Sequence, residues 1–290
     1  MNALLQYTVQ GLAAGSFYAL AALGLAIIFG VLGVVNFAHG AFYMLGAVTA
    51  AVLLDSFGLS LWWSLLVVPI LMFGFGVVVE RLLVQWLLRL DPLYNFLLTF
   101  GLTLVVVELV KQRYGVSGLP YELPGALRGR ADVAGVVLPY YQLFVLLASA
   151  VVCALVWLVM TRTRVGMIVR ASTEKPELAR ALGVDVGRWV TPVFGFGVAL
   201  AGLAGVLAAP FRAITAEMGN SFAIILFAVV VIGGLGSIVG AVVAGFLVGL
   251  VEAFGQAYAP TFAQILIFVL MAVIILVRPA GLFGRAEATA

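Results

Sequence analysis

Long apolar runs alternate with short polar stretches along this chain of 290 residues. An α-helix needs about 20 mostly apolar residues to cross the hydrocarbon core of a bilayer. The sequence therefore predicts about eight membrane-spanning segments, at Val9–Phe29, Phe37–Leu54, Leu61–Val79, Leu93–Val110, Tyr140–Met160, Val190–Pro210, Phe222–Val251 and Phe262–Val277. The runs are continuous rather than alternating, which excludes a transmembrane β-barrel.

The seventh segment is too long for one upright helix, because no charged residue lies between Glu217 and Glu252. It is interrupted at Gly233-Gly234-Leu235-Gly236-Ser237. This break leaves about 13 residues on each side, too few to span a bilayer. We therefore expect two half-helices that meet at the glycines as a re-entrant pair.

A similar break lies in the N-terminal half, where Gly30 and Gly40 enclose Asn36 and His39 between two apolar runs. Paired interruptions in the two halves of a transporter point to a substrate site near the membrane midplane. We predict that the breaks face each other and line a path. The equal alternative is that Asn36 and His39 only satisfy the backbone groups that a broken helix frees.

The composition supports a membrane protein and excludes soluble classes. Hydrophobic residues make up 65% of the chain and charged residues 9%, whereas soluble domains are about 25% charged. The single cysteine, Cys153, and the single histidine, His39, argue against a metal site. We expect an all-α, polytopic transmembrane helix bundle that forms one domain over residues 1–290, with broken or re-entrant helices in both halves.

The distribution of Lys and Arg predicts an orientation, since cytoplasmic loops are enriched in these residues. It places the Thr161–Trp189 loop in the cytoplasm and the Lys111–Pro139 loop in the periplasm, where its glycines and prolines predict irregular structure. The N-terminus is then periplasmic and the C-terminus cytoplasmic. A re-entrant pair at Gly233 belongs to this arrangement, because a single broken span would reverse the tail and weaken the charge bias.

Two acidic residues near span ends have simple interpretations. Glu108 precedes Lys111 by three positions on a predicted helix, and an ion pair between them is favoured over a proton relay. Glu80 stands beside Arg81 at the end of the third span, where we expect an interfacial anchor.

The Thr161–Trp189 loop predicts a short helix that begins at Pro176 and stops at Gly183, with Ser172 or Thr173 as a cap. Its apolar residues, such as Leu178 and Leu182, have no core of their own to pack against. They require either a partner protein or a lipid surface.

The same loop resembles the coupling loop of ABC importer permeases of the branched-chain amino-acid family (LivH-like). That family's pattern is met by Arg170-Ala171, Ala179 and Gly183. Further resemblance lies in Gly33–Ala47 with its Asn-Phe-Ala-His-Gly run, in Ile232–Ala241 with Gly-Gly-Leu-Gly-Ser, and in the tail Arg278–Gly284. The resemblance covers essentially the whole chain.

The resemblance implies a permease subunit of an ATP-driven importer in the bacterial inner membrane, which translocates branched-chain or other hydrophobic amino acids. It implies a second homologous permease, two cytosolic ATPases and a periplasmic binding protein as partners, with no cofactor, no metal and no nucleic acid. Candidate residues of the translocation path are Asn36, Phe37, His39, Tyr43, Gly233, Gly234, Gly236 and Ser237. Candidate residues for ATPase coupling are Arg170, Pro176, Leu178, Ala179, Arg180, Leu182 and Gly183.

The chain itself is not expected to be an enzyme, because neither lysine stands in a Gly-Lys-Ser/Thr phosphate-binding loop. Two alternatives stay open. Leu82–Leu90 lacks the Tyr-Arg-Pro-Leu run expected of the closest leucine-transport members, which leaves urea, short amides or aromatic carboxylates as other substrates. A proton-coupled secondary transporter would need buried carboxylates or histidines, for which Glu108, Glu252 and His39 are the candidates.

Overall fold

The computed structural model describes residues 2–88, 90–133, 136–174, 178, 181–183 and 185–284. Within these ranges, eight helices are long and apolar enough to cross a membrane, and one further apolar helix is shorter. The predicted all-α, polytopic bundle is confirmed.

The long helices are α1 (Asn2–Leu32), α2 (His39–Phe57), α3 (Leu61–Val79), α5 (Pro92–Tyr114), α6 (Tyr140–Arg162), α9 (Val186–Ala208), α11 (Ile238–Tyr258) and α12 (Ala263–Val277). The remaining elements are a π-helical turn (Glu80–Val84), α4 (Gln85–Leu87), two 3-10 turns (Gly125–Leu127 and Pro260–Phe262), β1 (Arg130–Val133), β2 (Val136–Pro139), α7 (Arg164–Glu174) and α10 (Met218–Gly233).

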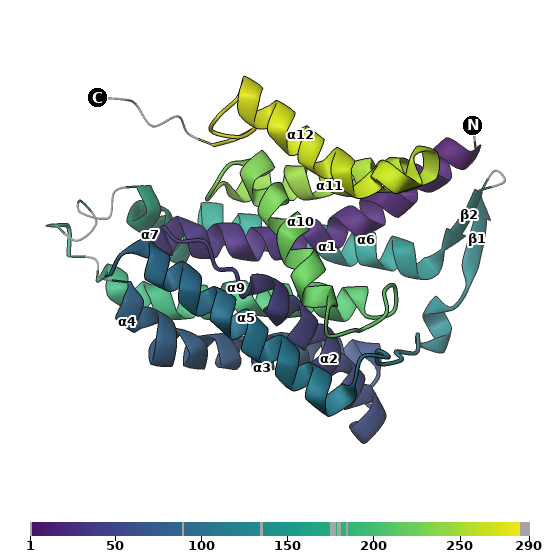
Figure 1. Ribbon diagram of the computed structural model, residues 1–290, viewed down its shortest axis with the longest axis horizontal. Coiled ribbons are helices and arrows are strands. Elements are labelled where there is room, and N and C mark those ends of the chain that lie inside the picture. Colours follow the sequence, from purple (N-terminus) through teal and green to yellow (C-terminus); the bar gives the residue numbers. More distant parts are fainter. Residues whose placement is uncertain are drawn as a thin grey trace.

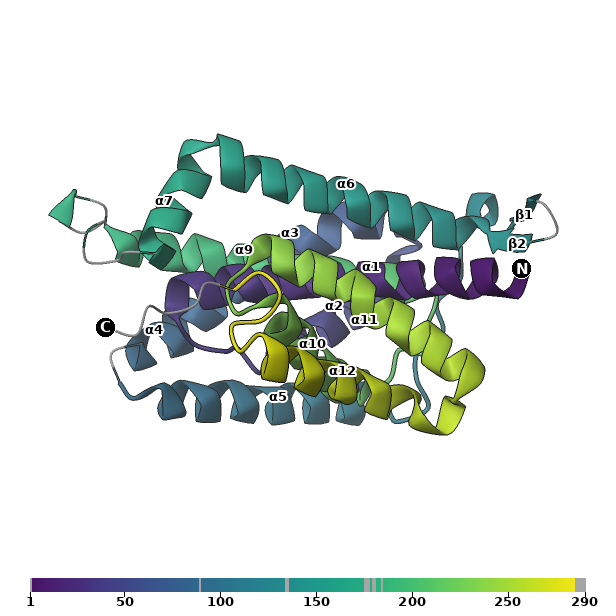
Figure 2. The same ribbon diagram turned by 90° about the horizontal axis from the view of Figure 1, so that it is seen from above.

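Most helices run along the long axis of the molecule, and α10 crosses them steeply (Figure 1). α1 lies in the middle of the bundle, between α6 and α5 (Figure 2), and is buried along most of its length, as is α9. The N-terminus of α1 and the β1–β2 hairpin lie at one end, whereas α7 lies at the other (Figure 1). The two long loops therefore lie at opposite ends of the bundle, as their alternation predicts.

Small residues allow α1 and α11 to pack closely in antiparallel directions. A Cβ atom at Gly245 would lie 2.5 Å from the backbone nitrogen of Ala19, and one at Gly249 would collide with the backbone of Gly15 and Gly11. Such close approach is typical of small residues between membrane helices. Backbone packing is therefore the role of Gly245 and Gly249 in this fold.

The break between α10 and α11 is where the sequence predicts it, but its two sides are unequal. α10 has 16 residues, whereas α11 has 21 and continues to Tyr258. The expectation of two half-helices is therefore wrong for the second side. Its physical reason is Glu252, which seemed to end the apolar run but is buried and paired inside the bundle.

The helix α3 likewise continues past its predicted end, through the π-helical turn and α4. Glu80 is only 2% exposed, and its Oε2 accepts a hydrogen bond of 2.6 Å from the Thr191 hydroxyl on α9. The interpretation of Glu80 as an interfacial anchor is therefore wrong. Thr191 supplies the hydrogen bond that a buried carboxylate requires.

The expected ion pair of Glu108 is also wrong. Its Oε1 accepts a hydrogen bond of 3.5 Å from the side chain of Gln112, and Lys111 is not among its partners in the described chain. Gln112 lies four positions on and shares the same face of α5, which suits a side-chain pair on a helix.

The Lys111–Pro139 loop is more ordered than its many glycines and prolines predict. α5 extends to Tyr114, and β1 and β2 form an antiparallel hairpin in which Arg130 pairs with Pro139. The loop is also tied to the segment before α10, since the Leu119 N–H donates to the Ile214 carbonyl at 2.9 Å.

Candidate functional site

The connection between α1 and α2 brings unpaired polar groups into the apolar bundle. Gly33 has a φ of +68°, which ends α1. Asn36 is 4% exposed, and its Oδ1 accepts a hydrogen bond of 3.0 Å from the Ala38 N–H in a turn that leads into α2. Its Nδ2 has no hydrogen-bond partner among the described residues. A buried donor without a partner is costly, so this group is suited to a ligand.

His39 begins α2 and is almost fully buried. Its Nε2 lies 3.0 Å from the Ala21 carbonyl of α1. Since a carbonyl oxygen only accepts, Nε2 carries the proton and Nδ1 is left as an acceptor, without a partner in the described chain. His39 therefore joins two helices through one nitrogen and keeps the other free.

The helix α5 holds this connection from the side. The Thr99 hydroxyl accepts from the Phe37 N–H, and the Thr103 hydroxyl donates to the Phe37 carbonyl, each at 3.3 Å. The Phe37 ring meets Phe96 edge to face at 4.7 Å and stacks with Phe227 of α10 at 6.1 Å. The sequence-based prediction did not include the two threonines. Their spacing of four residues places both hydroxyls on one face of an apolar helix, which could have indicated a polar contact.

Tyr43 connects the break to the centre of the bundle through stacked rings. Its ring lies 3.7 Å from that of Phe222 on α10, and Phe222 stacks on Tyr18 of α1 at 5.5 Å. All three rings are buried. Phe222 thus connects Tyr43 to Tyr18, which belongs to a second polar site that the sequence did not reveal.

The second break, between α10 and α11, uses most of its polar groups internally. Gly234 and Gly236 have φ values of +98° and +77°, and the Ser237 hydroxyl caps α11 by accepting from the Gly240 N–H at 3.1 Å. The N–H groups of Gly234 and Ser237 are bonded to backbone carbonyls. They are therefore occupied in this structure.

The tail after α12 covers this break. Leu282 N–H donates to the Ile232 carbonyl at 2.8 Å, and Phe283 N–H donates to the Gly233 carbonyl at 3.1 Å. A Cβ atom at Gly234 would collide with the backbone of Gly284. The tail and the glycine break, which both resemble the family, thus pack against each other.

The two breaks approach each other through the helix ends beside them. A Cβ atom at Gly236 would lie 3.6 Å from the Cα atom of Gly30, near the end of α1. Gly40 packs instead against Gly219 and Ala223 near the start of α10. The candidate residues of the path are consequently distributed along α10 rather than gathered at one point.

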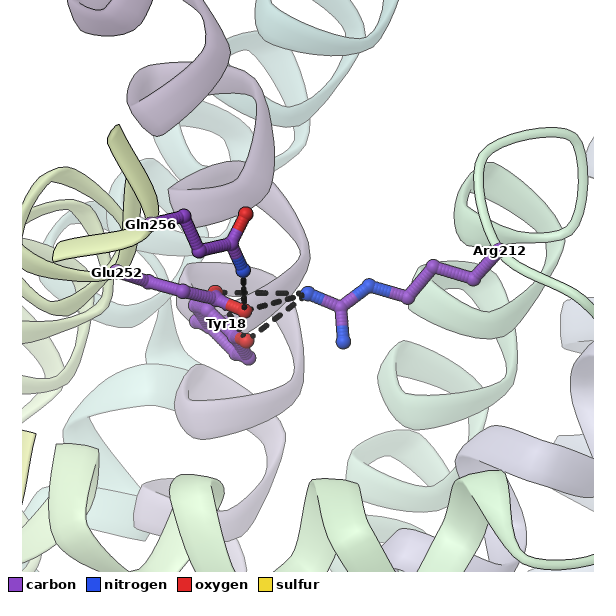
Figure 3. A network of polar contacts seen from close by, with 4 residues as sticks. All are labelled: Tyr18, Arg212, Glu252 and Gln256. Carbon is purple, nitrogen blue, oxygen red and sulfur yellow. Dashed lines mark hydrogen bonds and ion pairs between the residues drawn. The ribbon is translucent and has the colours of Figure 1, made fainter. Parts of the chain in front are cut away.

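A network of charged and polar side chains, which we call the Arg212 network, joins α1, α11 and the loop between α9 and α10 (Figure 3). Arg212 Nη2 donates to Glu252 Oε1 at 3.1 Å and to the Tyr18 hydroxyl at 3.1 Å. The Tyr18 hydroxyl donates to Glu252 Oε2 at 2.6 Å, and Gln256 Nε2 donates to Oε1 at 3.3 Å. The Glu252 carboxylate is therefore fully engaged.

Arg212 lies outside the membrane-spanning helices and is positively charged. Tyr18 and Glu252 beside it raise the pKa of the guanidinium above its ordinary value. From the sequence, Glu252 was a candidate only for proton coupling, and nothing singled out Arg212. Their 40-residue separation gave no periodic signal of a pair.

The loop with the candidate coupling residues is described only in part. Its first section forms α7, in which Ser172 is buried, and the start of the predicted helix at Pro176, where Ser172 or Thr173 was expected as a cap, lies outside the described residues. Leu178 and Leu182 are exposed and linked by a helical hydrogen bond, and Gly183 has a φ of +83°, which confirms the predicted stop. Pro176, Ala179 and Arg180 lie outside the described residues, whereas Arg170 lies on α7.

The fold and the buried polar break define a multi-pass membrane transport protein. Residues 7–277 match the family described as "Branched-chain amino acid transport system / permease component". The chain belongs to this family.

Similar curated proteins extend over nearly the full length. The chain is 31% identical to the high-affinity branched-chain amino acid transport system permease protein BraD of Pseudomonas aeruginosa, covering 98% of this chain and 96% of that protein. It is 27% identical to LivH of Escherichia coli K12, with the same coverage, and 30% identical to a probable branched-chain amino acid transport permease protein LivH of Methanocaldococcus jannaschii, over 77% of this chain and 71% of that protein. These relatives support the permease interpretation and do not favour a proton-coupled transporter.

Proposed function

We propose that the chain is the membrane-spanning subunit of an ATP-driven importer that carries branched-chain amino acids across the bacterial inner membrane. The observation that supports this best is the α1–α2 connection, where the Asn36 amide and the His39 ring each keep an unpaired nitrogen inside an apolar bundle. Polar groups at such a position are functional by default in membrane proteins.

The path runs from the Arg212 network, past the stacked Tyr18, Phe222 and Tyr43 rings, to the α1–α2 connection. Phe37, Phe96 and Phe227 give that connection an apolar wall for a branched side chain. Asn36 Nδ2 donates to the substrate and His39 Nδ1 accepts from it. At the second break, Gly233, Gly234, Gly236 and Ser237 act as a hinge that allows α10 to move against α11.

Energy for transport comes from separate subunits. The exposed Leu178 and Leu182 insert into a cleft on a cytosolic ATPase, which places α7 and the following loop in the cytoplasm, together with the C-terminus. The N-terminus and the β1–β2 hairpin then face the periplasm, where a binding protein delivers the amino acid. A second, homologous permease completes the complex.

Reconstitution of the complete complex in liposomes tests the proposal. With ATP inside and the loaded binding protein outside, we expect uptake of leucine, isoleucine and valine. Uptake that requires a proton gradient but no ATP would contradict the energy source. Uptake of urea or an aromatic carboxylate without uptake of branched-chain amino acids would contradict the substrate.

A further inference from the structure

We propose that the Arg212 network recognises the charged head of a zwitterionic α-amino acid before the substrate enters the bundle. Arg212 binds the α-carboxylate, while Glu252 and Tyr18 bind the α-ammonium group. The inference rests on the proposed function and names the residues that would select its substrate.

The position of the ion pair argues for a role beyond stability. Glu252 lies within a membrane-spanning helix, where its side chain is only 11% exposed. Replacing a buried ion pair by apolar residues is often neutral or stabilising, so such a pair is weak evidence for a purely structural role. Ionisable residues in membrane helices commonly mark substrate pathways.

Only one of the three guanidinium nitrogens of Arg212 donates hydrogen bonds within the described chain. All of its hydrogen bonds to the network start from Nη2, and Nε and Nη1 have no partner among the described residues. The side chain is 39% exposed, so the guanidinium can be reached from outside the core. A guanidinium has five donors that match a carboxylate, which makes the free nitrogens a suitable anchor for the substrate.

The exchange of partners keeps every charge compensated. When the α-carboxylate binds Arg212, the contact between Arg212 and Glu252 can break, because the α-ammonium group takes the place of the guanidinium at Glu252. The Tyr18 hydroxyl then accepts a hydrogen bond from the ammonium, as it now does from Arg212. No buried charge is left unpaired at any stage, which avoids the main cost of opening an ion pair in a membrane.

The surroundings suit an apolar amino acid. Phe211, next to Arg212, is 38% exposed and packs edge to face on Phe17 at 5.5 Å. On the other side, Phe222 stacks on Tyr18 and leads to Tyr43. Urea has no charge and an aromatic carboxylate has no ammonium group, so neither would occupy both halves of this site.

Transport by the reconstituted complex tests this assignment through the variant Glu252→Gln. Glutamine keeps the size of the side chain and an acceptor for Tyr18, but it removes the charge that the ammonium needs. We expect leucine uptake to fall about tenfold or more, with the ATPase subunits still bound and a lower thermal unfolding temperature, because Arg212 loses the charge of its partner. The control is Arg128→Gln, which removes an exposed ion pair with Glu122 and should leave uptake at the level of the unaltered complex.

A charge-exchanged variant, Arg212→Glu with Glu252→Arg, separates recognition from a structural clamp. The exchange restores an ion pair between the loop and α11 but reverses the sites for carboxylate and ammonium. We expect uptake to stay low. Recovery to the level of the unaltered complex would overturn the proposal in favour of a clamp.

A photoreactive leucine that carries a diazirine in its side chain gives a second measurement on the unaltered complex. We expect it to label the segments around Tyr18 or Phe222, and its N-acetylated form to label them about tenfold less. Equal labelling by both forms would overturn the assignment even if Glu252→Gln fails to fold. Absence of branched-chain amino-acid uptake by the unaltered complex would instead contradict the proposed function itself.

Discussion

At the scale of single residues, polar side chains decide where this apolar chain bends and where its helices continue. Glu80 and Glu252 both seemed to lie at the ends of apolar runs, yet both are buried and bonded to a distant helix or loop. A carboxylate in a bundle is tolerated only with such partners. Removing a partner should therefore destabilise the protein more than removing an exposed hydroxyl.

The variant Thr191→Val tests this dependence at Glu80. Valine keeps the shape of threonine but loses the hydroxyl that donates to Glu80 at 2.6 Å. We expect a loss of about 1–3 kcal/mol in the free energy of unfolding, visible as a lower unfolding temperature of the purified complex in detergent. Thr8→Val is the matched control, because the Thr8 hydroxyl makes an exposed hydrogen bond within its own helix. Equal unfolding temperatures for both variants would contradict the role of Thr191.

The sequence located some functional candidates but not their partners. Asn36 and His39 stood out because polar residues interrupted an apolar run, and the structure leaves a free nitrogen on each. Arg212 and Tyr18 could not be found in this way, since the contact between them joins residues 194 positions apart. Such contacts follow from tertiary packing. They leave no periodic pattern in a single sequence, so they cannot be predicted from it.

At the scale of helices and loops, glycines fix how closely neighbours approach. The antiparallel contact of α1 and α11 has no room for a Cβ atom at Gly249, whereas Gly74 on α3 has no neighbour within 4 Å of such an atom. The two positions thus differ in the room they leave for a side chain, although both are helical glycines.

The variants Gly249→Ala and Gly74→Ala should have opposite effects. The first overpacks the α1–α11 contact and should cost about 1–3 kcal/mol. The second fits without contact and should be neutral or stabilising by up to about 1 kcal/mol, because alanine favours helix more than glycine does. Thermal unfolding of the two purified complexes measures the difference, and a stabilising Gly249→Ala would contradict the observed packing.

The helix breaks were predicted in position but not in form. The glycines at 233, 234 and 236 correctly indicated the end of α10, because Gly234 and Gly236 adopt positive φ angles that suit glycine. The length of α11 was underestimated, since a composition rule counts Glu252 as polar without regard to its pairing. The β1–β2 hairpin was also missed, as its four-residue strands carry little pattern.

The loop after α7 provides a prediction about ATPase coupling. Leu182 is 77% exposed, and if it packs into an ATPase cleft its burial contributes about 1.5–3 kcal/mol. Leu182→Asp should therefore weaken association with the ATPase subunits and abolish ATP-driven uptake while membrane insertion persists. Co-purification of the ATPase measures this, with Val137→Asp on the β1–β2 hairpin as a control. Normal co-purification and uptake by Leu182→Asp would rule out this loop as the coupling element.

At the scale of the whole molecule, the proposed sites of substrate recognition and ATPase coupling lie at opposite ends of one bundle. The loop between α9 and α10, which carries Arg212, is bonded to the segment before the β1–β2 hairpin through Leu119 and Ile214. The helix α7 lies at the opposite end of the molecule from that hairpin (Figure 1). Between them, α10 contacts both the Tyr43 stack and the glycine break, so its movement can link the two ends. The α1–α2 connection must then meet water in at least one state of the transport cycle.

Cysteine accessibility at this connection tests that central claim most directly. In a complex with Cys153→Ser, cysteines replace Asn36, Phe37 and His39 one at a time. Gly40 is left unchanged, because a Cβ atom there would collide with the backbone of Gly219. A membrane-impermeant thiol reagent is applied without nucleotide and with ATP. The buried control is Ala244→Cys on α11. We predict reaction at position 36 or 37 in one of the two states and none at 244, whereas protection of all three positions in every state, with uptake intact, would contradict the account.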